Sequence, residues 1–347
     1  MGVTIKDVAK KTGLSITTVS LVLNKKDSRI PEKTREIIEN VAQELRYAPN
    51  QAAISLSTKK TGLIALVIPR KTFFFFADLL SSVESSCRNN GYALNISLPE
   101  RDELSCLEAL RETLRRGADG VIFDPSFFRD EFFPAYRDLI LESESPICSL
   151  SGIGANLLPN SIIPDHRQGA YLAASHLLGH GHNGIGLLAG SKENHVVSAL
   201  LRGIEDALEE KNLPSNVLSA VFCNTMNGGT INGEDSAAFG YEGFESLLNT
   251  RPEGSLAGII TGSAGIAAGV LRRANEMGIK IPEQLSVISY GNIPPDADYS
   301  PPLSTVSIHY DRIALKAVNL IKKLIQGGPA LSPEMAPPSL ILRGSTV

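Results

Sequence analysis

The chain has 347 residues, of which 43% are hydrophobic, so it is long and apolar enough for two or three domains with full cores. Its 33 basic and 37 acidic side chains give a formal charge of −4, an average that argues against a nucleic-acid partner. The average hides an uneven distribution. Residues 1–60 hold 11 basic and 6 acidic side chains, whereas the other 287 residues hold 22 and 31. A short basic head therefore precedes a larger acidic body.

The sequence shows no sign of a membrane or an oxidising compartment. No stretch approaches the roughly 18 apolar residues of a transmembrane helix, and the polar N-terminus lacks the apolar core of a signal peptide. We therefore expect a cytoplasmic protein without membrane contact. The cysteines occur singly, without the spacing of a zinc site or a CxxC redox motif, so we expect no metal and no cofactor. They are Cys87, Cys106, Cys148 and Cys223.

The head begins with two short predicted helices joined by a tight turn. Thr4 and Asp7 have the spacing of a capping box at the start of the first helix, and Gly13 ends it. Ser15 caps the second helix, whose two faces differ in composition. Its buried stripe is expected to be Val19, Val22 and Leu23, and its outward side chains Ile16, Thr17, Ser20 and Leu21. This pattern predicts a helix-turn-helix.

Two further segments complete the head. A third helix begins at Pro31, a favoured first helical position, and we expect it to close the core. Its core residues are predicted to be Ile37, Ile38, Val41 and Leu45. Asn50 caps a short hinge helix that ends near Ser57 and is followed by a basic linker. So short a helix needs a partner, either DNA or a second copy of itself. The expected domains are a DNA-binding headpiece at 1–48 and a hinge with linker at 49–61.

The head resembles a known family. The segments TIKDVAKKTGLSITTVSLVLN and RYAPNQAAISL are similar to the headpiece of the lactose repressor and purine repressor (LacI/GalR) family of bacterial regulators. The resemblance implies that the second helix enters the major groove and that paired hinge helices insert a leucine, here Leu56, into the minor groove. Base-reading side chains would be Ile16, Thr17 and Leu21. The implied DNA-binding set is Thr4, Ile5, Ser15, Ile16, Thr17, Thr18, Ser20, Leu21, Asn24, Tyr47, Asn50, Ala53 and Leu56.

Two positions of the head depart from the family pattern. Leu21 stands where many members carry Arg or His, so a bidentate contact with guanine is absent there. Reading of the DNA is then expected to lean on thymine methyl groups and on DNA shape. Ile54 replaces a common hinge Arg, and the loss of that charge should weaken binding more than redirect it.

The body alternates short β-rich apolar runs with helix-like segments, which predicts parallel sheets with crossover helices. The runs are 63–69, 92–98, 120–125, 146–151, 185–190, 217–222, 256–261 and 285–289, and the helices include 78–90, 103–116, 168–179, 198–211 and 265–277. These are too many strands for one small sheet. We therefore expect an α/β fold with two lobes and a ligand crevice at the carboxyl ends of the strands.

The body also resembles the effector domain of the same family, which is similar to periplasmic sugar-binding proteins. The segments that carry this resemblance are DHRQGAYLAASHLLGHGHNGIGLLAG, LRRANEMGIKIPEQLSVISYGN and SPPLSTV. It implies a dimer formed through the body, with the chain crossing between lobes near residues 161, 291 and 325. The lobes would be 62–161 plus 292–325 and 162–291 plus 326–347.

The expected effector pocket departs from the family most. Family members that bind sugars or purines usually use an Arg and an Asp where this chain has Leu200 and Gly291, and Ala264 replaces another common Asp. Each buried polar ligand group left unpaired costs about 1 to 3 kcal/mol, so a typical sugar would bind poorly unless other groups substitute. The alternatives are a less polar effector or a pocket that no longer senses. The candidate effector-binding residues are Phe75, Phe76, Asp124, Ser126, Asp165, His166, Asn194, Leu200, Arg202, Gly291 and Asn292.

Some of these candidates have a simpler interpretation. Arg202 also fits an exposed helix position, and Asp165 with His166 also fits a helix cap. The histidines of GHGHNG, His180 and His182, fit the end of a helix better than a metal pair. The glycines of GIGLLAG do not match the dinucleotide-binding spacing.

No segment has the pattern of a nucleophile elbow, a Walker loop or an HExxH zinc site, so we expect no enzymatic activity. The expected function is that of a dimeric repressor of transcription that binds a near-palindromic operator and is controlled by a small-molecule effector between the lobes. One alternative is a solute-binding protein, which the basic head opposes. Another is an α/β enzyme that uses the interlobe cleft, which the lack of a catalytic constellation opposes.

Overall fold

The structure is a computed structural model of the whole chain. It describes residues 3–23, 29–48, 55, 60–70, 77–100, 102–126, 128–152, 157–223, 233–249 and 258–347. The chain divides into two units, which are the head at Met1–Thr61 and the body at Gly62–Val347. Apart from Ser55, the predicted hinge helix lies outside the described residues.

The described part of the head contains helices α1 (Ile5–Thr12), α2 (Ile16–Leu23) and α3 (Glu32–Glu44). Gly13 ends α1 with a φ of 70°, a left-handed conformation that glycine adopts without strain. The buried core consists of Val8, Ala9, Val19, Val22, Ile38 and Ala42. The prediction that Ile37 joins this core is wrong. Its neighbour Ile38 points inward, and Ile37, one helical step away, is 45% exposed.

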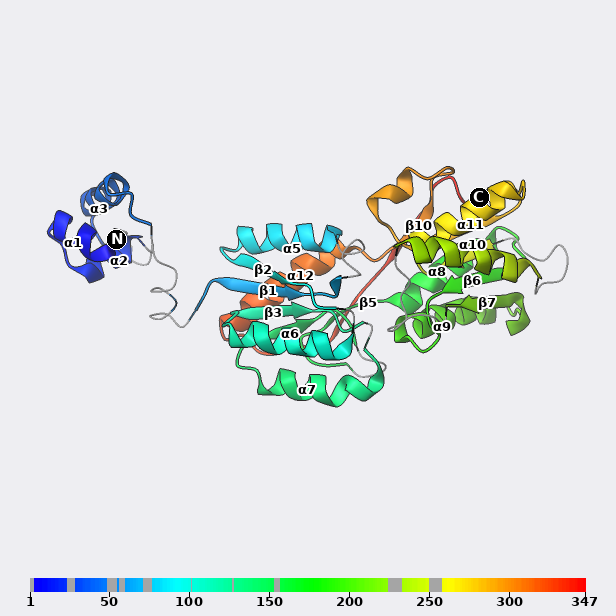
Figure 1. The fold of residues 1–347 in the computed structure, drawn as a ribbon, viewed down its shortest axis with the longest axis horizontal. Coiled ribbons are helices and arrows are strands. Elements are labelled where there is room, and N and C mark those ends of the chain that lie inside the picture. The colour runs from blue at the N-terminus through cyan, green and yellow to red at the C-terminus, as the bar shows by residue number, and fades with distance from the viewer. Residues whose placement is uncertain are drawn as a thin grey trace. The chain divides into compact units, whose positions relative to one another are not determined.

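The first lobe is a parallel sheet covered on both faces (Figure 1). Its strands are β1 (Leu63–Val67), β2 (Ala93–Ser97), β3 (Gly120–Phe123) and β4 (Ile147–Ser149), in the order β2-β1-β3-β4. Helices α5 (Ala77–Asn89) and α12 (Tyr310–Ile325) pack on one face, and α6 (Glu103–Arg115) and α7 (Phe133–Glu142) on the other. Along β1, Ile64 and Leu66 face the first pair of helices, while Ala65 and Val67 face the second. Burial of both faces explains the continuous apolar run of this strand.

The second lobe is a larger sheet, in the order β12-β10-β9-β8-β6-β7. Its strands are β6 (Ile185–Ala189), β7 (Leu218–Phe222), β8 (Gly258–Thr261), β9 (Ser286–Gly291), β10 (Ser304–Ser307) and β12 (Ser339–Ile341). Only the β10–β12 pair of this sheet is antiparallel. Helices α8 (His166–Gly179) and α9 (His195–Glu210) cover one face, and α10 (Gly233–Asn249) and α11 (Ala264–Glu276) the other.

Helices α8 and α9 approach each other closely at Gly203. A Cβ atom at this position would lie 2.0 Å from the carbonyl oxygen of Arg167 and 2.9 Å from the backbone nitrogen of Tyr171. Both distances are far below van der Waals contact. The contact between these helices therefore requires glycine at residue 203.

Three segments connect the lobes. The first contains β5 (Ile162–Pro164) and the third contains β11 (Glu334–Ala336), and these two strands pair in parallel. The expected crossing at residue 291 is wrong, because β10 pairs with β9 and so extends the second lobe to Ser307. The chain returns to the first lobe just before α12.

Short 3₁₀ turns occupy Asp130–Phe132, Ser215–Val217 and Pro294–Ala297.

The sequence patterns located most of the regular elements of the body. Each of the eight predicted apolar runs overlaps a strand, and each predicted helix overlaps an observed one. The short strands β5, β10 and β11 and the helices α7, α10 and α12 lie outside the predicted segments. An α/β body with two lobes is thus confirmed.

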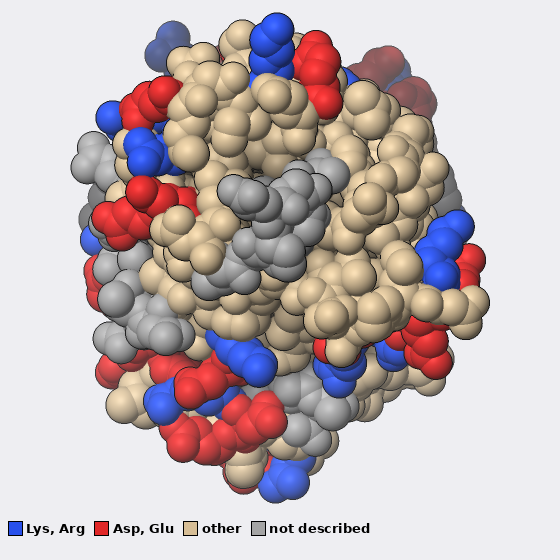
Figure 2. Space-filling view, turned by 90° about the vertical axis from the view of Figure 1, so that its right-hand side faces the viewer, with Lys and Arg blue, Asp and Glu red and all other residues tan. Residues whose placement is uncertain are grey.

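The body has no concentrated positive charge at the end of the second lobe, among the residues described there. Figure 2 shows charged side chains of both signs around the rim of this face, and the described atoms between them are mostly uncharged. A surface that holds phosphates would need clustered Lys and Arg.

None of the helices in the described ranges is long and apolar enough to cross a bilayer.

Candidate nucleic-acid interface and ligand cavity

The starts of α1 and α2 are fixed by hydroxyl and carboxylate caps. The backbone N–H and the hydroxyl of Thr4 both donate to Asp7 Oδ2 at 2.8 Å, and these bonds hold the pKa of Asp7 below its usual value. At α2, the backbone N–H of Thr18 donates to Ser15 Oγ at 3.0 Å. Thr4 and Ser15, two of the implied DNA-binding residues, therefore also set where these helices begin.

Helix α2 has a buried face and an outward face, as predicted. Val19 and Val22 lie in the head core. On the outward face Ile16 is 46% exposed, Thr17 is exposed, and Ser20 and Leu21 are half-buried. The whole helix, ITTVSLVL, has no charged or amide side chain, so this face presents methyl and hydroxyl groups. The second helix of a helix-turn-helix is the one that enters the major groove.

The remaining predicted DNA contacts lie in the same unit or outside the described residues. Ile5 and Tyr47 pack against the head core and are half-buried, and Thr18 is half-buried at the start of α2. The predicted contacts Asn24, Asn50, Ala53 and Leu56, and the departing residue Ile54, lie outside the described residues.

The two lobes of the body touch through polar side chains. Asp124, at the end of β3, accepts hydrogen bonds from the N–H and hydroxyl of Ser126 at 3.0 and 2.9 Å. Asn194 caps α9 in the second lobe, and its Nδ2 donates to the carbonyl oxygen of Ser126 at 3.4 Å. Beside it, Ser151 Oγ lies 3.1 Å from His195 Nε2. The structure thus brings together three predicted effector residues: Ser126 and Asn194 meet across the lobes, and Asp124 holds Ser126 within the first lobe.

Two histidines at or near this contact, His195 and His166, have lowered pKa values and are neutral near pH 7. His166 Nδ1 lies 3.1 Å from the hydroxyl of Tyr290. Burial, together with a smaller contribution from the neighbouring His195, lowers the pKa of His166 to about 3. Burial also lowers the pKa of His195, against the opposite effect of Asp130. His166 was a predicted effector residue, whereas His195 and Tyr290 were not.

Other predicted effector residues are placed elsewhere. Asp165 accepts a hydrogen bond from the N–H of Gln168 at 2.9 Å and caps α8, which matches its simpler interpretation. Leu200 lies in the core of the second lobe with 2% exposure, and Arg202 is exposed on α9. Phe75 and Phe76 lie outside the described residues.

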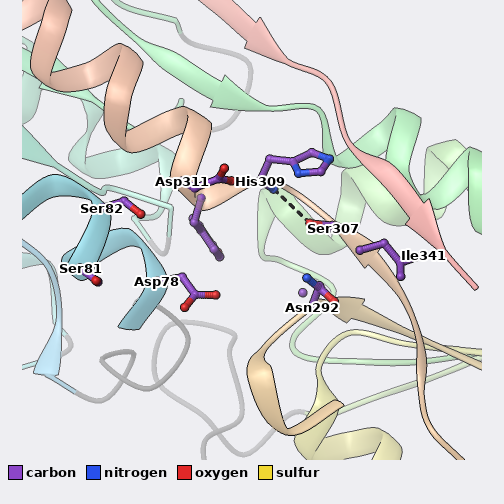
Figure 3. Close-up of a pocket in the computed structure, with 10 residues that line it drawn as sticks. Asp78, Ser81, Ser82, Asn292, Ser307, His309, Asp311 and Ile341 are labelled. Atoms are coloured by element: carbon purple, nitrogen blue, oxygen red, sulfur yellow. Dashed lines mark hydrogen bonds between the residues drawn. The ribbon is translucent and has the colours of Figure 1, made fainter. Parts of the chain in front are cut away.

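A cavity of about 300 Å³ lies between the lobes where β9 and β10 end (Figure 3). Carboxyl ends of parallel strands are where ligands bind in open α/β sheets. Of the predicted effector residues, Gly291 and Asn292 line it. The others that line it are Asp78, Ser81, Ser82, Ser307, His309, Tyr310, Asp311 and Ile341. Several of these follow β10, which the sequence patterns did not predict, and recognition of STVS at 304–307 as a strand would have pointed to them.

The described residues offer little for metal or thiol chemistry. No group of three or more His, Cys, Asp or Glu among them could hold a metal ion. The four cysteines are buried and form no disulfide, and burial raises the pKa of Cys87 to about 11 and of Cys148 to about 12. His182 Nε2 lies 2.9 Å from Ser286 Oγ, and His180 Nδ1 lies 2.8 Å from the carbonyl oxygen of His176. The histidines of GHGHNG therefore have structural partners.

Comparison with known proteins matches both units. Residues 4–50 match the model of bacterial regulatory proteins of the lacI family, and residues 174–346 match a periplasmic binding protein-like domain. The chain is 31% identical to the HTH-type transcriptional repressor PurR of Haemophilus influenzae (strain PittEE), over 99% of this chain and 98% of that protein. The chain belongs to the lacI family. A PurR of Actinobacillus pleuropneumoniae serotype 3 (strain JL03) is 30% identical over 93% of this chain and 91% of its own length.

Solved structures of this lacI family agree with that assignment. The lac repressor dimer bound to operator and the anti-inducer ONPF has a TM-score of 0.84 and 26% identity, over the full length of both chains. The lac repressor bound to ONPG in the repressed state has a TM-score of 0.82 and 27% identity. The named relatives are transcriptional repressors, not enzymes. The chain is thus a DNA-binding transcriptional regulator, with a helix-turn-helix head and a periplasmic-binding-protein-like body.

Proposed function

We propose that this regulator represses transcription by binding a near-palindromic operator as a homodimer, with the outward face of α2 in the major groove. The observation that carries the proposal is the outward face of α2, where Ile16, Thr17 and Leu21 stand on the second helix of a helix-turn-helix. Two copies related by a two-fold axis read two half-sites, so the operator shares that symmetry.

Affinity and sequence reading come from different groups of the head. The 11 basic side chains of residues 1–60 attract the phosphates, which hold the protein on any duplex and make binding depend on salt. The outward face of α2 lacks the Arg, Lys, Asn and Gln side chains that make bidentate contacts with base edges. Ile16 and Leu21 contact thymine methyl groups instead, and the hydroxyls of Thr17 and Ser20 bond either kind of base pair.

The body makes this binding respond to a small molecule. The hydrogen bonds Asn194–Ser126 and Ser151–His195 join the lobes, so a change in the lobe angle breaks or forms them. A ligand that prefers one arrangement shifts the population toward it and thereby changes the affinity for DNA. The lac repressor structure with operator and anti-inducer supports this coupling by resemblance. We place the protein in the cytoplasm and assign it no enzymatic activity.

Selection of DNA from a random library by the purified full-length protein tests the proposal. We expect enrichment of one two-fold symmetric site whose half-sites contain A·T pairs at the positions nearest α2, with binding that weakens steeply as salt is raised. Ile16→Ala should weaken binding of that site, whereas Ile37→Ala, an equally exposed change on α3, should not. Failure to enrich any sequence, or equal effects of the two substitutions, would overturn the proposal.

A further inference from the structure

The interlobe cavity is lined by carboxylates and has no Lys or Arg among its described lining residues. Asp78 stands in the first turn of α5 and Asp311 in the first turn of α12. Neither carboxylate has a hydrogen bond or ion pair with another described residue. Figure 3 shows both on the first-lobe side of the cavity, with Asn292 across from Asp78.

The positively charged N-terminal ends of the two helices offset only part of this negative charge. A helix N-terminus carries about half of a positive elementary charge and therefore favours an acidic residue in its first turn. Two carboxylates beside two helix N-termini leave a net charge of about −1 on the first-lobe side of the cavity. That surplus matches one positive charge on an occupant.

On the other side of the cavity, Asn292 is held in one orientation. Its Oδ1 accepts hydrogen bonds from Arg343 Nη2 at 2.8 Å and from the hydroxyl of Thr305 at 3.0 Å. Because Arg343 can only donate, the oxygen of the amide must face it. The Nδ2 group, a donor, is left for the cavity (Figure 3).

Ser307 supplies a second donor. It ends β10, is 5% exposed and lines the cavity. Its oxygen accepts a long hydrogen bond, 3.4 Å, from the N–H of His309, but its hydroxyl proton has no acceptor among the described residues. A buried hydroxyl without an acceptor is costly, and an oxygen atom of a ligand would satisfy it.

We propose that the cavity binds a small hydroxylated amine, whose ammonium group lies between Asp78 and Asp311 and whose oxygen accepts hydrogen bonds from Asn292 and Ser307. A volume of about 300 Å³ suits a molecule of monosaccharide size. Anionic ligands are excluded by charge. The inference rests on the proposed function, because it takes this molecule to be the effector of the regulator.

Two matched series of probes test the ligand class on the full-length protein without DNA. One is glucosamine, glucose and glucuronate, and the other is tyramine, tyrosol and 4-hydroxyphenylacetate, each measured by calorimetry at a pH where the amine is protonated. In at least one series we expect the amine to bind about tenfold or more tighter than the alcohol, and the carboxylate to bind least. Amines that bind no better than their alcohols, or that do not bind in either series, would overturn the inference.

Substitutions that remove one carboxylate charge test whether the amine binds beside Asp78 and Asp311. Asp78→Asn and Asp311→Asn should each weaken amine binding about tenfold and leave binding of the alcohol unchanged. Asp138→Asn on α7 removes the same charge from an exposed carboxylate paired with Arg137, and should change nothing. Equal behaviour of all three variants would place the amine elsewhere and overturn the assignment.

The same proteins separate this inference from the proposed function. If an amine binds and also changes the affinity for the selected operator, both stand. If the operator is selected but no amine binds, the ligand class is wrong and the regulator remains. If amines bind but no DNA sequence is enriched, the cavity chemistry stands and the proposed function fails.

Discussion

The outward face of α2 and the interlobe cavity differ in how their side chains are brought together. The face comes from one helix of eight consecutive residues, Ile16–Leu23, so the helical period alone decides which side chains point outward. The cavity combines residues from Asp78 to Ile341, which meet only because both lobes and their crossing segments are in place. One site is local and the other depends on the tertiary fold.

The two sites also differ in charge. A neutral face of methyl and hydroxyl groups stands on a basic head, whereas a negative cavity lies in an acidic body. Attraction to phosphates and reading of bases are therefore separated within the head. In the body, charge itself selects the occupant. Substitutions that act on one unit should leave the other intact, and the following experiments test that independence.

The largest effect is expected from a substitution that removes buried side-chain volume from the head core. Ile38 is fully buried, and Ile38→Ala should destabilise the head by about 2 to 5 kcal/mol, which is most of the stability of so small a unit. Calorimetry should show a lost or lowered head transition with an unchanged body transition, together with lost operator binding. Ile37→Ala, at a 45% exposed neighbour, should cost less than about 0.5 kcal/mol. A matching loss in the body transition would show that the units are not independent.

The corresponding change in the body is at the contact between α8 and α9. Gly203→Ala places a methyl group 2.0 Å from the carbonyl oxygen of Arg167 and should destabilise the body by about 1 to 3 kcal/mol. Gly179→Ala, at the end of α8 with nothing within 4 Å, is the matched control and should be neutral or stabilising. Chemical denaturation measures both. Equal stabilities of the two variants would contradict the close contact of these helices.

A third experiment changes the base preference of α2. Leu21→Arg introduces a bidentate donor that should favour guanine by about 1 to 3 kcal/mol at one position of each half-site. Repeated selection from a random library measures the shift. Gln43→Arg adds the same charge at an exposed position of α3 and should strengthen binding to all sequences alike. A new guanine preference in both variants, or in neither, would mean that α2 does not read the bases.

The smallest effect concerns pH and the body alone. The pKa of His166 is lowered in the folded state, so the unfolded chain binds the proton first as the pH falls below about 6.5. This contribution to stability is fully present above that pH and is lost progressively as the pH falls toward the folded pKa of about 3. His166→Gln should flatten the slope of unfolding free energy against pH by less than about 1.4 kcal/mol per pH unit. Tyr290→Phe should keep the slope, because burial is the main cause of the shift.

The sequence predicted elements with strong local signals and missed those set by tertiary contacts. The apolar run at 63–69 and the cap at Ser15 were enough to locate β1 and α2. The strand β10 is polar, STVS, and is buried only because it pairs with β9 and β12, so no apolar run marked it. The resemblance placed a lobe crossing near 291, whereas the pairing of β10 with β9 moves it to just before α12.

The two candidate sites also differ in whether a local sequence signal or a tertiary contact defines them. Periodicity predicted the outward side chains of α2, and the structure agrees for Ile16 and Thr17. In the cavity, only Gly291 and Asn292 were predicted, and both came from the resemblance to the family's effector pocket. Asp78 and Asp311 resemble ordinary first-turn acids in sequence, and their shared cavity appears only when α5 and α12 pack on one face of the sheet.

The most direct measurement is the affinity of the full-length protein for the selected operator and for a duplex of the same composition in scrambled order, each over a range of salt concentrations. We expect the operator to be preferred by about a thousandfold or more, with affinity for both duplexes falling as salt rises. Equal affinity for the two duplexes would contradict the assignment of α2 as the helix that reads the DNA sequence.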